Sequence, residues 1–207
     1  MQEFNIISEK WDAIRKEESL IFKAFTPFFT KAKTVLDAGC GNGRNIKSLT
    51  NYFQQVYGID SSRELLKLAL KNNEKLVEQG KLILSLQDFN NTFFEDNFFD
   101  CIVGVASFHH SKNLEETLLE AKRILRPKGQ LFFSLWNYYQ PKFFDKGKEQ
   151  LIKFGNVKRY YHFYEEEELI NLVQRHFKLS NYFYEFKGKK IIDKFKAENL
   201  LVCAIKN

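Results

Sequence analysis

The stretch VLDAGCGNG, from Val35 to Gly43, decides the fold of this chain. An apolar strand ends there in the carboxylate of Asp37, the glycines permit a tight turn, and a helical segment follows. Because glycines lack side chains, they also let the backbone approach a ligand closely. In a dinucleotide-binding fingerprint the third glycine would fall on Arg44, and Asp37 would repel a pyrophosphate. The turn therefore favours a cationic ligand with an amino group and disfavours a nicotinamide-dependent oxidoreductase.

Two further acidic residues follow strand ends later in the chain. Asp60 ends the second expected strand, where a carboxylate accepts hydrogen bonds from ribose hydroxyls, and Ser61 or Ser62 can cap the next helix. Asp88 and Phe89 follow the third strand, so that the acid can reach an adenine amino group and the ring its face. Each residue alone also fits a structural role in a turn, cap or loop. Their order at successive strand ends favours a ligand site. The candidate cofactor-binding residues are Asp37, Gly39, Gly41, Asn42, Gly43, Asp60, Ser61, Asp88, Phe89 and Ala106.

Strands and helices alternate five times before the pattern changes, which predicts an α/β fold with a doubly wound, mostly parallel sheet of seven strands, Rossmann-like in architecture. The expected strands are 34–37, 55–60, 81–86, 100–105, 130–135, about 180–186 and about 200–206. The expected helices are 9–31, with Pro27 as a kink or end, the segment through Leu49, one from about 62 to 79, 114–125 and 165–176. The residues 126–129 are expected to form a turn and 137–160 a long connection. We expect one domain over 1–207, with an N-terminal helical extension at 1–31, a cofactor-binding half at 33–136 and a substrate-side part at 137–207.

Composition sets limits on the class of protein. The 207 residues suffice for one α/β domain with a proper core. The three cysteines are scattered without disulfide or zinc-ligand spacing, so we expect reduced thiols, no metal and a cytoplasmic protein. The longest apolar run, 101–108, is too short for a membrane span. The net charge of +6 is compatible with a nucleic-acid partner, although a composition rich in Lys, Asn, Phe and Ile can also produce it.

The segments around Asp37, Asp60 and Asp88 resemble motifs one to three of the class I S-adenosylmethionine (SAM)-dependent methyltransferases. The block RILRPKG at 123–129 is similar to the turn before that family's fifth strand. The resemblance covers roughly residues 33–136. It implies SAM as cofactor, a cationic nucleoside of the kind that the acidic strand ends favour.

A narrower resemblance lies in the substrate-side half. The stretch RYYHFY at 159–164, with Glu166, Glu168 and Leu169 after it, is similar to a signature of methyltransferases that esterify a modified wobble uridine in tRNA. That family includes a stand-alone eukaryotic enzyme and a domain fused to an AlkB-type hydroxylase. The resemblance further matches His109, His110, Arg15 and, before the last strand, Asn199. Three departures are that Glu167 replaces a usual glycine, that 185–197 is longer and more basic, and that 137–157 matches weakly.

The reaction that this resemblance implies is methylation of the carboxylate of 5-carboxymethyluridine. Since a carboxylate has a pKa of about 4, it is ionised at neutral pH and needs no general base. It needs cationic donors that place it in line with the methyl group and offset its desolvation. The candidate catalytic residues are Arg15, His109, His110, Arg159 and His162. Alternatives stay open: Arg15 as a solvated charge, one of the two adjacent histidines as a packing residue, and His162 as a core histidine.

The resemblance also implies partners. The expected substrate is the tRNA anticodon region, whose phosphates the lysines of 142–158 and 187–190 can follow. The third strand is unusually apolar and is expected at a sheet edge, where a small zinc-binding activator subunit docks by strand addition in relatives. Two other hypotheses remain: a class I methyltransferase that acts on a small molecule, and a non-catalytic subunit that keeps the fold to hold a partner.

Overall fold

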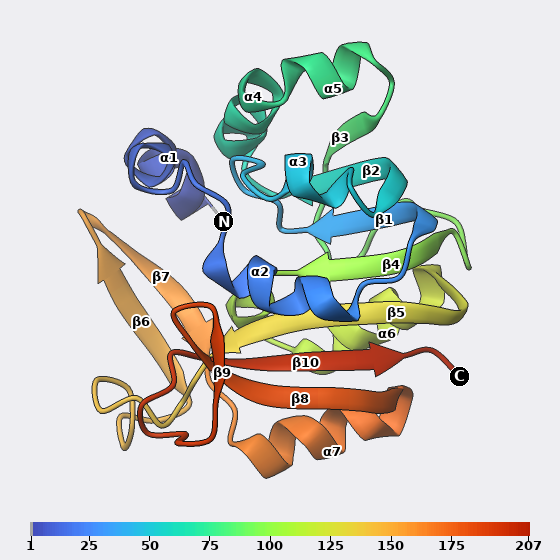
Figure 1. The fold of residues 1–207 in the computed structure, drawn as a ribbon. Helices are drawn as coiled ribbons and strands as arrows, with labels where there is room; N and C mark the ends of the chain where they lie inside the picture. The colour runs from blue at the N-terminus through green and yellow to red at the C-terminus, as the bar shows by residue number, and fades with distance from the viewer. Residues whose placement is uncertain (1) are drawn as a thin grey trace.

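An eight-stranded sheet forms the centre of the computed structural model, which describes residues 2–207 (Figure 1). In spatial order the strands are β3 (Leu82–Leu86), β2 (Phe53–Asp60), β1 (Ala32–Ala38), β4 (Phe99–Gly104), β5 (Leu125–Trp136), β10 (Asn199–Ile205), β8 (Lys178–Phe186) and β9 (Lys189–Ile191). The first five are mutually parallel, and β10 runs antiparallel between β5 and β8. The expected doubly wound, mostly parallel sheet is confirmed, with the three-residue β9 added at one edge.

Helices cover both faces of this sheet. In chain order the helical elements are α1 (Gln2–Ile14), α2 (Leu20–Phe25), the 3-10 turn η1 (Thr26–Phe28), α3 (Ile46–Leu49), α4 (Arg63–Asn72), α5 (Glu74–Glu78), η2 (Phe108–His110), α6 (Leu114–Ile124) and α7 (Glu166–His176). One buried core packs α6 and α7 against the sheet, and the other packs α2 and α3 against its opposite face. Burial of these apolar side chains on two faces explains why the central strands are apolar almost throughout. Across residues 2–207, no helix combines the length and apolar character that a membrane span requires.

The N-terminal helix differs from the expectation of one helix over 9–31. The chain is helical from Gln2 to Ile14, leaves the helix at 15–19 and resumes as α2 and η1, with Pro27 in the first turn of η1. The break has a physical cause in long-range hydrogen bonds. The Arg15 carbonyl accepts a hydrogen bond from the Asn42 side chain at 3.0 Å, and the Ser19 N–H donates to the Asn45 side chain at 3.0 Å. The linker 15–19 is therefore fastened to the glycine turn instead of continuing the helix.

The expected connection at 137–160 contains a hairpin of its own, formed by β6 (Glu149–Phe154) and β7 (Val157–His162). The two-residue turn between them is Gly155-Asn156, with Gly155 at φ +61°. This pair is a hairpin signal when alternating strands flank it, and the long-connection expectation missed it. Figure 1 shows the hairpin beside α1, and the Trp11 and Phe154 rings join the two at 5.7 Å.

The expected turn at 126–129 is not a separate turn in the structure, because β5 begins directly after α6 and includes residues 126–129. The segment remains irregular: Lys128 has φ +64°, and the β4–β5 register shifts opposite it. The late strands lie where the sequence predicts them. The carboxyl ends of the parallel strands lie together, so Ala38, Asp60 and Gly104 are on one side of the molecule. The hairpin and α1 lie on the same side (Figure 1).

Candidate active site

The glycine turn after β1 has a backbone conformation that residues with side chains rarely adopt. Gly39, Gly41 and Gly43 all have positive φ, at +77°, +58° and +76°. A Cβ on Gly39 would lie 2.5 Å from the Ser107 Cβ, so only glycine fits between the turn and the segment that follows β4. Gly43 serves packing instead, because its Cβ would lie 2.5 Å from the Asn73 Nδ2 of the α4 end, and Gly43 does not line the cavity beside the turn.

That cavity has a volume of about 390 Å³ and extends from the glycine turn to the β6–β7 hairpin. Its size is in the range of ordinary ligand sites. The expected cofactor-binding residues at its wall are Gly39, Gly41, Asn42, Asp60, Ser61, Asp88, Phe89 and Ala106. The Asn42 amide donates to Asp12 at 2.8 Å as well as to the Arg15 carbonyl, so this side chain holds the N-terminal segment over the turn.

Asp60 is held at the tip of β2 by backbone donors. Its carboxylate accepts hydrogen bonds from the Gly41 N–H at 2.9 Å and from the Ser62 N–H at 2.8 Å. Burial raises its pKa, and these two bonds act in the opposite direction. Ser62 caps α4 by accepting from the Leu65 N–H, while Ser61 lines the cavity. A carboxylate fixed in this way presents its remaining lone pairs to the cavity, where ribose hydroxyls can donate to them.

Asp37 lies behind the turn and outside the cavity wall, only 2 % exposed. Burial, with the nearby Asp60 carboxylate, raises its pKa to about 7. Its Oδ2 atom has no hydrogen-bond partner among the described residues. A buried acceptor without a donor is costly, and a cation bound beside the turn would relieve that cost. The orphaned oxygen and the glycine cradle therefore fit a positively charged ligand.

Beside the cavity, two guanidinium groups stack on aromatic rings. The Arg15 guanidinium carbon lies 4.0 Å from the Trp11 ring centroid, and that of Arg159 lies 5.0 Å from the same centroid and 5.3 Å from that of Tyr161. Burial lowers the pKa of both arginines, and for Arg15 the Arg159 charge adds to the effect. The Arg15 Nε and the Arg159 Nε and Nη1 atoms are buried without a hydrogen-bond partner within the described chain. Arg15 lines the cavity, whereas Arg159 lies behind Trp11 and Tyr161.

Both adjacent histidines line the cavity, but as neutral rings. The His109 Nδ1 atom accepts from the Trp136 N–H at 3.3 Å, and burial lowers its pKa well below the usual value. The His110 Nδ1 atom lies 2.8 Å from the Tyr160 carbonyl, which only accepts, so Nδ1 carries the proton; burial lowers the His110 pKa to about 4. Both therefore differ from the expectation of cationic donors: burial removes the positive charge that sequence alone suggests.

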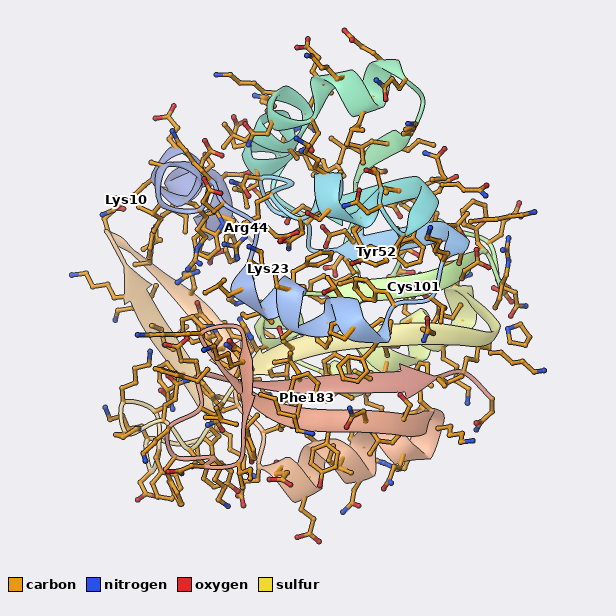
Figure 2. The ribbon with its side chains drawn as sticks, in the orientation of Figure 1. Lys10, Lys23, Arg44, Tyr52, Cys101 and Phe183 are labelled. Atoms are coloured by element: carbon orange, nitrogen blue, oxygen red, sulfur yellow. The ribbon has the colours of Figure 1, made fainter. Side chains whose placement is uncertain are left out.

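His162 and Asn199 lie away from this cavity. The His162 ring is half-buried and stacks on Tyr164 at 4.4 Å, and it does not line the cavity. The Asn199 amide donates to the buried Glu185 carboxylate at 2.7 Å. Sequence reasoning did not single out several aromatic and charged residues of the cavity wall that no motif marks, among them Phe4, Trp11, Arg44 and Trp136. Arg44 was used only to exclude a dinucleotide, yet it lies between α1 and α2 with its charge near Arg15 and Asp37 (Figure 2).

Comparisons with known proteins agree with this geometry. A family model described as a methyltransferase domain matches residues 36–133. A probable SAM-dependent methyltransferase, CRG1 of Saccharomyces cerevisiae, is 30% identical over 114 residues, which are 55% of this chain and 38% of that protein. The ubiquinone biosynthesis O-methyltransferase of Coxiella burnetii is 29% identical over 107 residues, 52% of this chain and 45% of that one. The chain thus spans less than half the length of these curated relatives.

A solved structure extends the likeness to the whole fold. In the complex between the Trm112 methyltransferase activator of Haloferax volcanii and a methyltransferase, the matching chain superposes with a TM-score of 0.73 at 15% identity, covering 99% of this chain and 97% of that one. Residues 36–133 therefore match a methyltransferase domain, and the chain as a whole has the Rossmann-like fold of class I SAM-dependent methyltransferases, for which S-adenosylmethionine is the methyl donor.

Proposed function

We propose that the chain transfers a methyl group from SAM to the carboxylate of 5-carboxymethyluridine at the tRNA wobble position, giving the methyl ester. The observation that carries the proposal is the arginine pair. Arg15 and Arg159 stack near one another, with three buried guanidinium nitrogens unpaired among the described residues. Unpaired buried cations are costly, and an anionic acceptor would satisfy them. The sequence resemblance of 159–169 to the wobble-uridine family supplies the identity of the anion.

The residues around the cavity suit a carboxylate acceptor better than a hydroxyl. When bound, SAM supplies a sulfonium methyl: the C–S bond breaks, a C–O bond forms to the carboxylate oxygen, and no proton is released. Arg15 would hold one acceptor oxygen and leave the other free to react, with Arg159 reinforcing the field from behind the aromatic rings. His110, whose pKa is about 4, is too weak a base to take a proton from a hydroxyl near neutral pH.

A second candidate is O-methylation of a small molecule. The observation that favours it is the Coxiella burnetii relative, itself named an O-methyltransferase. A hydroxyl acceptor requires loss of a proton, so its rate should rise with pH toward the pKa of the acceptor. Methylation of a carboxylate should be nearly independent of pH between about 6 and 9, because the acceptor is ionised throughout this range.

We further propose that a small zinc-binding activator subunit docks on the β3 edge. The edge strand has no neighbour on one side within the described sheet, and its Ile83 and Leu86 side chains are 47% and 45% exposed. Apolar edge strands are sites for strand addition. The Haloferax volcanii methyltransferase of the same fold is in complex with the Trm112 methyltransferase activator.

The test is incubation with SAM carrying a labelled methyl group and tRNA bearing a free carboxymethyl group. Ester formation gives a label that mild base releases as volatile methanol. Arg159→Gln, which removes the charge and keeps a polar side chain, should lower transfer about tenfold and leave SAM affinity unchanged, because a positive charge about 10 Å from the acceptor contributes roughly 1.5 kcal/mol at an effective dielectric constant of about 20. Lys178→Gln, which removes the charge of an exposed lysine at the start of β8, outside the segments expected to follow the phosphates, is the matched control.

The outcomes separate the hypotheses. Label that stays on tRNA after base treatment would reject the ester, and transfer only to small hydroxyl compounds would favour the second candidate. Absence of SAM binding in calorimetry, with and without an activator subunit, would leave only a non-catalytic role.

A further inference from the structure

We propose that residues 186–196, with the facing loop at 137–147, form a surface that holds the RNA backbone next to the reactive nucleotide. The inference rests on the proposed function and names the surface that would bind the same substrate. We call this surface the basic-aromatic surface.

Its charge is concentrated and mostly unpaired. Lysines occupy five of the eleven positions from 186 to 196, against one acid, Asp193. Lys196 forms an ion pair with Asp193 at 3.4 Å, and the other four lysines have no carboxylate partner in the part of the chain that the structure describes. Lysines that no protein acid neutralises are available to phosphates. When they bind, the counterions condensed on the nucleic acid are released, and this release drives affinity.

Exposed rings and apolar groups lie among these lysines. Ile192 is 96% exposed, Phe195 57% and Phe186 36%. The Lys187 ammonium lies 5.1 Å from the Phe186 ring centroid, and that of Lys194 lies 5.5 Å from that of Phe195. Alternation of cations with open aromatic faces is the arrangement that binds single-stranded nucleic acid, where phosphates meet lysines and bases stack on rings.

The loop after β5 extends the same surface. The Tyr139 and Phe195 rings contact at 5.8 Å, and the Lys194 ammonium lies 3.9 Å from the Tyr139 centroid. The Asn137 amide donates to the Lys194 carbonyl at 2.6 Å, which fixes one segment on the other. The loop adds exposed Lys142 and Phe144.

A second cavity has lining residues in common with both this surface and the main cavity. Its volume is about 450 Å³, and Lys187 lines it together with Glu185 and the linker 15–19. Arg15 and Arg44 line this cavity and also the main one. A strand lying on the basic-aromatic surface can therefore pass one nucleotide along Lys187 to Arg15, where the acceptor carboxylate is expected.

The charge change Lys189→Glu with Lys190→Glu tests the surface. Lys31→Glu with Lys33→Glu makes the same change on exposed residues beside the start of β1, at the end of the sheet where the parallel strands begin. Binding of a fluorescent anticodon stem-loop is measured by anisotropy over a range of salt concentrations. Lys189→Glu with Lys190→Glu should weaken binding by about tenfold or more and reduce the log–log salt slope by about 1.4, at roughly 0.7 per lost phosphate contact. The control pair should change neither.

Phe195→Ala tests the stacking contribution separately. It should weaken binding roughly fivefold or more without changing the salt slope, because a stacked base carries no additional charge contact. All variants should retain the SAM affinity of the unchanged chain, which shows that they are folded.

Other results would overturn the inference. If the chain methylates tRNA and both double variants bind RNA like the unchanged chain, the surface assignment fails while the proposed function stands. Equal weakening by both double variants would indicate unspecific charge and would also reject it. If the chain binds no RNA but binds anionic phospholipid vesicles in a way that Lys189→Glu with Lys190→Glu abolishes, the surface is a membrane contact, and the tRNA substrate falls with the inference.

Discussion

Asp60→Asn is the substitution that most directly tests the cofactor site. The carboxylate uses one oxygen for the Gly41 N–H and the other for the Ser62 N–H, at 2.9 and 2.8 Å. Asparagine keeps the shape but has one oxygen, so one of these two bonds is lost, together with the negative charge. The lost backbone bond should lower the free energy of unfolding by about 1–2 kcal/mol.

The effect on SAM binding should be larger. Hydrogen bonds from ribose hydroxyls to a charged acceptor contribute roughly 1.5–3 kcal/mol, and each 1.4 kcal/mol changes affinity tenfold. We therefore expect the SAM dissociation constant to rise about 10- to 100-fold. Isothermal titration calorimetry measures this, and urea unfolding at the same pH measures the change in stability.

Asp100→Asn is the matched control, because it makes the same chemical change near the start of β4, at the end of the sheet away from the cavity. Asp100 accepts from the Lys33 and Thr34 N–H groups at 3.0 and 2.8 Å and from Arg126 at 2.6 Å. Its replacement should lower stability and leave SAM affinity unchanged. An Asp60→Asn chain that is folded and binds SAM like the unchanged chain would refute the assignment of Asp60, as would equal loss of affinity in both variants.

Three other predictions concern the turn and the edge strand. Asp37→Asn should raise the free energy of unfolding more at pH 8 than at pH 5, by at least about 1 kcal/mol, because the ionised group becomes costly as pH rises from about 4 through its folded pKa of about 7; urea unfolding at both pH values checks this. Gly43→Ala should cost roughly 2–4 kcal/mol, since its Cβ meets Asn73 at 2.5 Å, whereas Gly80→Ala, also at positive φ but with open space, should cost only about 1 kcal/mol. Ile83→Lys should leave the unfolding midpoint of the isolated chain unchanged and abolish co-purification of an activator subunit; a fully active monomer without any partner would contradict the docking proposal.

The cofactor turn was predictable because its signal is local. Glycines at 39 and 41 are required by backbone geometry, and the acids Asp37, Asp60 and Asp88 at or after the ends of β1, β2 and β3 suit the ligand charge, so both requirements appear directly in the sequence. The Gly155-Asn156 turn was equally local, and the hairpin was missed because the surrounding basic and aromatic residues suggested an irregular connection. The break at 15–19 was not predictable, because its hydrogen bonds join residues 26 and 27 positions apart.

The charge state of the two cavity histidines was the other failure. A His-His pair after a strand indicates cations only if it is solvated, and solvation depends on tertiary packing. Here His109 stacks on Tyr161 at 4.9 Å and His110 meets Phe4 at 5.0 Å, from elements far away in the sequence. Aromatic enclosure excludes water and favours the neutral imidazole. The cation role then falls to the arginines, whose higher pKa survives the same burial.

The distribution of charge in the cavity explains how the chain can orient two oppositely charged reactants. Asp60 and Asp88 line the cavity at the strand ends, and Arg15 lines it where its guanidinium stacks on Trp11, with Arg159 behind that ring. A sulfonium cofactor is attracted to the carboxylates, and a carboxylate acceptor is repelled from them and attracted to the arginines. The neutral histidines of the wall add no competing charge. Because the reaction cancels one positive and one negative charge, the neutral ester should be held less strongly than the acceptor, so the field that aligns the reactants also favours release of the product.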